Sequence, residues 1–331
     1  NTVGVMGKGI ALQFKKRFPG NFKAYAAACK AGGVQTGRMF VFDAGQLVRP
    51  RWIINFPTKR HWKSNSRIED IDAGLDDLAK VIAELGIRSI AVPPLGCGLG
   101  GLRWTEVKPL IEAKLAAVDA DVLVFGPEGS PAAAAIANAS PRPAMSVGKA
   151  ALVRIVDRYA QSALGGAGLI ETQKLMYFLQ TAGQPLRLNY VKGLYGPYAD
   201  NLRHVLIKVE GHFLTGFGDG TGPVLDAEPI EVLPGAAEEA DEVVAAYPDL
   251  AERIDRVLQL SEGFESAYGM ELLATVHWAA TAEGCTDRAC VVDTVHGWNQ
   301  RKERLFTPSH INTALDHLVE HGWLDGDAFA A

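Results

Sequence analysis

The most constraining feature of this sequence is a short apolar segment that leads directly into a glycine-rich loop. Residues 89–94 predict a buried strand, and a helix is expected to begin near Trp104. Between them lie Gly96, Gly98, Gly100 and Gly101. The backbone N–H groups of such a loop are not shielded by side chains, and the following helix adds the positive end of its dipole. Strand, loop and helix together predict a cradle for a phosphate or pyrophosphate group.

A second glycine loop lies near the N-terminus. It has the sequence Gly4-Val5-Met6-Gly7-Lys8-Gly9 and precedes a helical pattern over 9–18. A Walker phosphate loop requires Ser or Thr directly after its lysine, but Gly9 follows Lys8. Neither loop has the Gly-x-Gly-x-x-Gly spacing of a dinucleotide site. One glycine loop alone is more often a tight turn, but two independent loops favour binding of a nucleotide diphosphate without redox chemistry.

Strand and helix patterns alternate along residues 1–127, which predicts a three-layer α/β/α fold with a central mixed sheet. We expect helices at 9–18, 20–31, 68–85 and 105–117, and strands at 39–42, 52–56, 88–93 and 121–126. The domains predicted are 1–135, with a truncated N-terminus, a linker at 136–147, and a mostly helical domain over 148–331. Helices are expected there at 149–162, 170–182, 199–210, 235–262, 264–283, 289–300 and 309–321.

The cysteines and histidines suggest no metal site and no disulfide framework. Four cysteines (Cys29, Cys97, Cys285 and Cys290) are scattered along the chain, which favours ordinary thiols and a reducing cytoplasm. Cys285, Cys290 and His296 lack the pairing of a zinc site. His277, His310, His317 and His321 are expected to be structural or solvated. No apolar run approaches the roughly 18 residues of a membrane-spanning helix, so no membrane association is expected.

The formal charge differs in sign between the two halves. Residues 1–146 hold 19 Lys and Arg against 12 Asp and Glu, whereas 147–331 hold 14 against 26. The acidic excess is concentrated in Asp219–Glu265, with 13 acids and two bases. The basic half suits a polyanion and the acidic half a basic protein surface, although solvated surfaces would look the same.

Several motifs carry a resemblance to a known family. The first loop with Asn1-Thr2-Val3, the segment Ile53–Trp62, and the second loop through Trp104 resemble a macrodomain. More narrowly, they resemble the DarG family of antitoxins, whose partner toxin, DarT, ADP-ribosylates thymidine in single-stranded DNA. The likeness covers 1–127. The segments Gln173–Tyr177 and Tyr195–Asp200 extend it more weakly, and they are similar to a helical toxin-neutralising domain of other antitoxins.

The resemblance implies a DNA ADP-ribosyl glycohydrolase that needs no cofactor. Its two loops would hold the diphosphate and distal ribose of ADP-ribose, which is both ligand and product. The residues implied are Gly4, Val5, Met6, Gly7, Lys8, Gly9, Ile10, Thr58, Pro94, Leu95, Gly96, Cys97, Gly98, Leu99, Gly100 and Gly101. The family's catalytic lysine matches Lys59. Such an amine could attack the anomeric carbon or donate a proton to the leaving base, whereas without the family an exposed lysine at a strand end is the simpler interpretation.

Three differences from the family pattern bear on this site. An Asn-Cys-Val stretch that usually separates Val3 from the first loop is absent, and its Asn normally lies near the distal ribose. The upstream acid that usually contacts adenine is also missing, so no adenine-binding carboxylate is named. Relatives that act on protein carboxylates carry Asp where this chain has Gly100, and this difference favours DNA as the substrate.

The resemblance suggests a partner for each of the two oppositely charged halves. Arg60, Trp62 and Lys63 are candidates for binding ADP-ribosylated single-stranded DNA through phosphate contacts and base stacking. Glu238, Glu239, Asp241 and Glu242 are candidates for binding a DarT-like toxin. Two alternatives remain open: an ADP-ribose reader without catalysis that sequesters the toxin, and a hydrolase acting on ADP-ribosylated protein.

Overall fold

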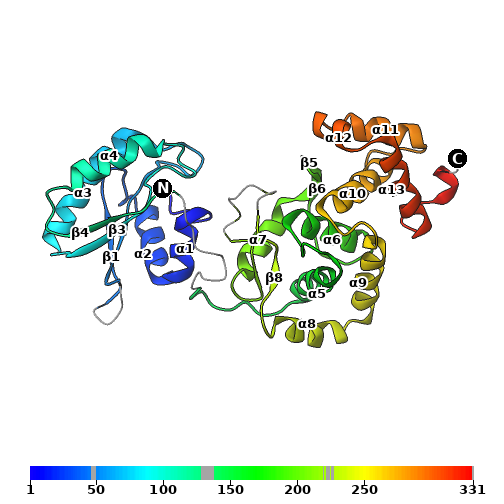
Figure 1. The fold of residues 1–331 in the computed structure, drawn as a ribbon. Coiled ribbons are helices and arrows are strands. Elements are labelled where there is room, and N and C mark those ends of the chain that lie inside the picture. Colours follow the sequence, from blue (N-terminus) through cyan, green and yellow to red (C-terminus); the bar gives the residue numbers. More distant parts are fainter. Residues whose placement is uncertain (46–49, 128–137, 219, 221–223, 225–226, 330–331) are drawn as a thin grey trace. The chain divides into compact units, whose positions relative to one another are not determined.

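The computed structural model describes residues 1–45, 50–127, 138–218, 220, 224 and 227–329. They divide into two compact units, Asn1–Pro141 and Arg142–Ala331 (Figure 1). Each unit has its own hydrophobic core. Residues 128–137, which include the end of the predicted first domain and the start of the predicted linker, lie outside the described residues.

The first unit alternates helices and strands, which confirms the predicted α/β class. Its elements are α1 (Gly9–Arg17), α2 (Pro19–Lys30), β1 (Phe40–Asp43), β2 (Trp52–Asn55), α3 (Ile68–Glu84), β3 (Ser89–Val92), α4 (Trp104–Leu115) and β4 (Asp121–Val124). β1 and β2 are antiparallel, with Phe40 opposite Asn55. β3 and β4 are parallel and joined through α4, as a parallel pair requires. Both strand directions are therefore present.

Two separate apolar clusters stabilise the first unit. α3 carries Ile71, Leu75, Leu78 and Ile82 at helical spacing, and these side chains are buried against α4 and β3. The second cluster joins α2, the first glycine loop and β1. In it the ring of Tyr25 packs edge-on against Phe40, with 5.4 Å between centroids. The strands are thus covered by α3 and α4 in one cluster and by α2 in the other.

The second unit is largely helical, as expected. Its elements are α5 (Val147–Ser162), α6 (Leu169–Thr181), β5 (Tyr190–Gly193), β6 (Gly196–Ala199), α7 (Asp200–Val209), β7 (Leu214–Thr215), β8 (Glu231–Val232), α8 (Ala236–Ala245), α9 (Pro248–Ser261), α10 (Ala267–Thr281), α11 (Arg288–His296), α12 (Gln300–Leu305), α13 (Pro308–Glu320) and the 3₁₀ turn η3 (Gly326–Phe329). α5, α6 and α10 form the centre and are buried over most of their surfaces.

Two details of the second unit differ from the sequence expectation. The helix expected over 235–262 is divided into α8 and α9, because Pro248 cannot continue a helix and instead occupies the first turn of the next one. The hairpin of β5 and β6 was not expected at all. It is held in place by α6, where Gln173 bonds both the N–H and the carbonyl of Ala199 and Lys174 donates to the carbonyl of Pro197 at 2.6 Å.

The two segments that resemble a toxin-neutralising domain have a structural role, because one of them contains a strand of this hairpin and the other packs against it. Gly196 has φ +90°, and a Cβ there would lie 2.8 Å from the hydroxyl of Thr275. Burial and the nearby Lys302 ammonium lower the pKa of Lys174 to about 7. The residues of these segments therefore build the interior of the second unit.

The expectation for the cysteines is wrong in one respect. Cys285 and Cys290 are joined by a disulfide, because the turn between α10 and α11 brings their Cα atoms within 5.5 Å. Cys29 and Cys97 are free thiols, as expected. Throughout the described part of the chain, no helix is long and apolar enough to cross a membrane.

Candidate active site

Lys59 lies in the loop after β2, between the N-terminal segment and the second glycine loop. Its carbonyl accepts a hydrogen bond from the N–H of Thr2 at 3.1 Å, and the Thr2 hydroxyl donates to the carbonyl of Arg60 at 2.6 Å. The Lys59 ammonium donates to the carbonyl of Leu99. The side-chain amine of Lys59 is therefore held against the second loop. The backbone of Lys59 and Arg60 is hydrogen-bonded to the N-terminal segment that leads into the first loop.

The second loop is closed by its own backbone. Cys97 donates to the carbonyl of Pro94 at 3.1 Å, and Leu102 donates to that of Gly96 at 3.1 Å. Gly96 and Gly101 have φ of +73° and +78°, a left-handed conformation that favours glycine. These bonds fix a curved backbone of the kind that can enclose an anionic group.

Ser66 packs directly beneath this loop. Its N–H donates to the carbonyl of Gly100 at 2.9 Å, and its hydroxyl is buried without a hydrogen-bond partner among the described residues. A Cβ on Gly100 would lie 2.3 Å from this hydroxyl and 2.3 Å from the carbonyl oxygen of Gly96. Position 100 therefore has no room for a side chain in this arrangement.

The first loop is fixed by Asn1 and by α2. The Asn1 side chain donates to the carbonyl of Val5 at 2.7 Å and accepts from the N–H groups of Val3 and Val5 at 3.2 Å. Gly4 has φ +75°, and a Cβ there would lie 3.2 Å from the Cα of Ala26. No side chain caps the N-terminus of α1, so its first N–H groups can meet an anion.

Five large apolar side chains around these segments are about half exposed. They are Val3 (46%), Val5 (45%), Ile10 (55%), Trp62 (49%) and Leu99 (55%). Apolar surface beside backbone donors suits a ligand that has both phosphate groups and flat sugar or base rings. By contrast, the side chains of Met6 and Leu95 are buried in the two cores, so only their backbones are available to such a ligand.

Arg60 is exposed to solvent but is paired with a residue of its own unit. Its guanidinium donates to both carboxylate oxygens of Asp70, at 3.2 and 3.0 Å. These hydrogen bonds lower the pKa of Asp70 below its usual value. Trp62 and Lys63 are exposed as well, but Lys63 forms no ion pair among the described residues, and its ammonium lies 4.9 Å from the centre of the Trp62 ring.

The four acidic candidates of the second unit lie on α8 but are not equivalent. Glu239 is paired with Arg142 at 2.6 Å, and Asp241 is paired with Arg154 at 2.6 Å. Glu238 and Glu242 are exposed and, among the described residues, form no ion pair. Since they are four residues apart, they share one face of the helix.

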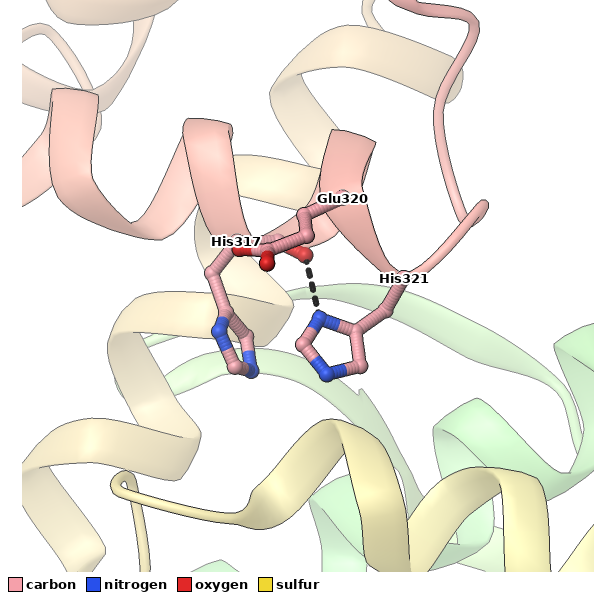
Figure 2. Close-up of side chains that lie close together, drawn as sticks. All are labelled: His317, Glu320 and His321. Atoms are coloured by element: carbon pink, nitrogen blue, oxygen red, sulfur yellow. Dashed lines mark hydrogen bonds between the residues drawn. The ribbon is translucent and has the colours of Figure 1, made fainter.

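The sequence analysis missed two features. Ser66 gave no signal, because it contacts a loop that lies 30 or more residues further along the chain. No ligand spacing was expected among the helical histidines, but His317, Glu320 and His321 come together on α13 (Figure 2). Their spacing of i, i+3 and i+4 was the signal that could have revealed them.

An α/β fold with two glycine loops, the second of which holds a lysine amine, is typical of a macrodomain, and residues 1–111 match the Macro domain family. The DNA ADP-ribosyl glycohydrolase of Thermus aquaticus is 47% identical over 326 residues, with 98% of this chain and 89% of the relative covered. The chain therefore belongs to the DarG family of DNA ADP-ribosyl glycohydrolases.

Two further matches each cover 38% of this chain. A DNA ADP-ribosyl transferase-DNA ADP-ribosyl glycohydrolase fusion protein of Thermosipho africanus is 39% identical over 142 residues, which is 38% of this chain and 37% of the fusion protein. The solved macrodomain of Thermus aquaticus DarG is 57% identical and has a TM-score of 0.38. The match covers 38% of this chain and 85% of that one.

Proposed function

We propose that this chain removes ADP-ribose from thymidine bases in DNA by hydrolysing the N-glycosidic bond, with Lys59 as the catalytic amine. The observation that carries this proposal is the placement of the Lys59 ammonium at the carbonyl of Leu99, against the second glycine loop. In this position the amine stands beside the loop that would hold the distal ribose. Family membership supports the same activity, because the relative from Thermus aquaticus bears its name.

The reaction breaks the bond between the anomeric carbon and the thymine nitrogen. Water supplies a hydroxyl group to the carbon, and the base leaves with a proton. Lys59 as an ammonium can donate that proton, because only one of its three N–H groups is needed to bond Leu99. The two loops bind the diphosphate through backbone N–H groups, which fixes the anomeric carbon relative to the amine.

A second role for Lys59 follows from the same geometry. As a neutral amine it could attack the anomeric carbon and break the bond to thymine, which leaves with a proton. The resulting glycosylamine opens to a Schiff base between Lys59 and the ribose, which water then hydrolyses. Reduction with borohydride during turnover would trap such an adduct on Lys59 but would leave the proton-donor mechanism unaffected.

The loop geometry supports DNA rather than protein as the substrate. The resemblance implies that protein-directed relatives carry an aspartate where this chain has Gly100, and the loop leaves no space for a side chain there. The excess of Lys and Arg in residues 1–146 suits a phosphate backbone.

We also propose that residues 148–331 bind and neutralise a DarT-like toxin, with residues 1–135 as the enzymatic domain and 136–147 as the linker. The Thermosipho africanus relative carries a transferase and a glycohydrolase on one chain, which supports a functional link between the two activities. The acidic surface of α8 suits a basic groove that binds DNA. Cytoplasmic location is part of this proposal, because both the DNA and the toxin that acts on it are found there.

The decisive experiment compares Lys59→Ala with the matched variant Lys80→Ala, which changes an exposed lysine on α3. Release of ADP-ribose from a modified oligonucleotide should fall at least about 100-fold in Lys59→Ala, since a positioned proton donor contributes about 10²–10⁴-fold. Binding of free ADP-ribose should persist in both variants. Full activity of Lys59→Ala, or release from a modified glutamate peptide in preference to DNA, would contradict the proposal.

A further inference from the structure

Three side chains with metal-binding groups gather on the last turn of α13. His317, Glu320 and His321 each bring one ligand atom into a group whose members lie within 4.8 Å of one another. Figure 2 shows the two imidazole rings side by side, with the carboxylate next to them. The ring centroids are 4.0 Å apart. Both rings are partly buried and Glu320 is exposed, so the group is open to solvent on one side.

Hydrogen bonds to backbone carbonyls fix which nitrogen of each ring is available. Nε2 of His317 lies 2.9 Å from the carbonyl oxygen of Leu260, so this nitrogen carries the proton and donates. Nδ1 of His321 lies 2.9 Å from the carbonyl oxygen of His317 and donates in the same way (Figure 2). The remaining nitrogens, Nδ1 of His317 and Nε2 of His321, therefore present lone pairs.

This arrangement resembles a metal site in two respects: the side chains are common metal ligands, and hydrogen bonds hold the histidine rings in place. Metal-binding histidines usually donate their other N–H to a carbonyl or carboxylate, which fixes the tautomer and the ring orientation. Here both rings have that support from the backbone itself. The ring of His317 is further held by Phe264, with 4.7 Å between centroids.

We propose that His317, Glu320 and His321 bind a divalent transition-metal ion, with zinc as the ion that this ligand set favours. Two imidazoles and one carboxylate suit zinc better than calcium or magnesium, which take oxygen ligands. Ligand atoms around tetrahedral zinc, at about 2.0–2.2 Å from the ion, lie about 3.4 Å apart. The ligand atoms of the group lie within 4.8 Å of one another, so binding would draw them closer together, and a fourth position remains open to water or to a partner's side chain.

The place of the group in the fold favours a cation. α13 ends at Glu320, and the dipole of the helix gives this end a partial negative charge. His317 also joins α13 to the end of α9 through Leu260. A bound ion would therefore fix the C-terminal turn of α13 against α9 and stabilise the second unit.

The test uses the full chain, stripped with a chelator and titrated with zinc chloride. We expect one ion per chain by calorimetry and a higher melting temperature of the second unit with zinc. His321→Gln should weaken affinity at least about 100-fold, because losing even an outer-shell partner costs about 10–100-fold. Glu320→Gln should weaken it less. His204→Gln, which changes an exposed histidine of α7, is the matched control and should bind as the wild type does.

A second measurement does not depend on any variant folding correctly. Zinc should perturb the ¹⁵N resonances of His317 Nδ1 and His321 Nε2 in the wild-type chain, whereas their partner nitrogens should keep their protons. Zinc binding that is equal in the wild type and in a His317→Gln/His321→Gln variant would place the ion elsewhere, for example on the free thiols, and would overturn the proposal. Unchanged histidine resonances at saturating zinc would do the same.

Discussion

The α-carbon of Gly100 faces the buried hydroxyl of Ser66 so closely that a Cβ on Gly100 would lie 2.3 Å from the Ser66 oxygen. The same Cβ would lie 2.3 Å from the carbonyl oxygen of Gly96. Contacts under 3.0 Å force atoms to move, and here one of them belongs to the backbone. The curvature of the second loop therefore depends on the absence of a side chain at position 100.

The Gly100→Ala variant should distort this loop. We expect a loss of about 1–3 kcal/mol in the free energy of unfolding of the first unit, as in other overpacked sites. ADP-ribose affinity should fall about tenfold or more, because the loop N–H groups would no longer converge. Thermal unfolding and calorimetric titration with ADP-ribose measure the two effects.

Gly98→Ala provides the matched control for stability. A Cβ on Gly98 meets nothing within 4 Å, and its φ lies outside the left-handed region. This variant should unfold at the same temperature as the wild type. Adding Ser66→Gly to Gly100→Ala should not restore stability, because the Gly96 oxygen remains. Equal destabilisation by alanine at 98 and at 100 would show that the clash is not the cause.

Arg60 and Lys63 should respond differently to replacement by alanine. Arg60→Ala should lower stability, because it removes both hydrogen bonds to Asp70. The pKa of Asp70 is lowered in the fold, so the stabilisation is present above the ordinary value of about 3.9 and is lost as pH falls through the lower folded value. The melting temperatures of Arg60→Ala and wild type should therefore converge in strong acid.

Lys63→Ala should instead reduce affinity for modified single-stranded DNA and leave stability unchanged. If Lys63 contacts one phosphate, the slope of log K against log salt should become shallower by about 0.7. Filter binding across a range of salt concentrations measures this slope. A change of slope in Arg60→Ala but not in Lys63→Ala would mean that Arg60, and not Lys63, contacts the DNA phosphate.

Local patterns in the sequence predicted most elements of the first unit, because α3 and the glycine loops depend on residues close together in the chain. Ser66 and Asp70 could not be predicted, since their roles come from contacts with Gly100 and Arg60 that depend on the tertiary fold. The disulfide of Cys285 and Cys290 depends likewise on the turn after α10. The candidate role of Lys59 came from the family resemblance alone; nothing in its local sequence distinguishes it from an exposed lysine.

The four acidic residues of α8 are expected to fall into two pairs, one that binds the toxin and one that stabilises the fold. Reversing Glu238 and Glu242 to lysine should weaken toxin binding about tenfold or more without affecting stability, because neither carboxylate pairs with a described residue. Reversing Glu239 and Asp241 should lower the melting temperature, since their partners Arg142 and Arg154 would face like charges. The affinity of each variant for a DarT-like toxin, measured by surface plasmon resonance, distinguishes the two pairs. Unchanged affinity after the first reversal would exclude this face.

The second unit should lose stability in mild acid because of His277. Its ring is buried beside the rings of Phe178 and Trp323, and its Nδ1 lies 2.8 Å from the hydroxyl of Tyr177. Burial lowers the pKa of His277 to about 4 from its usual value near 6.5. The fold therefore favours the neutral ring, so its contribution is fully present above pH 6.5 and is lost as pH falls toward 4.

The size of this effect is about 3 kcal/mol at pH 4, since each pKa unit corresponds to about 1.36 kcal/mol. Chemical unfolding followed by tryptophan fluorescence between pH 7 and 4.5 should show a steep fall for the wild type and for the control His204→Gln. His277→Gln can keep a hydrogen bond to Tyr177 but cannot be protonated, so its stability should fall less over the same range. A profile for His277→Gln parallel to that of the wild type would assign the acid sensitivity to other groups, such as the exposed histidines.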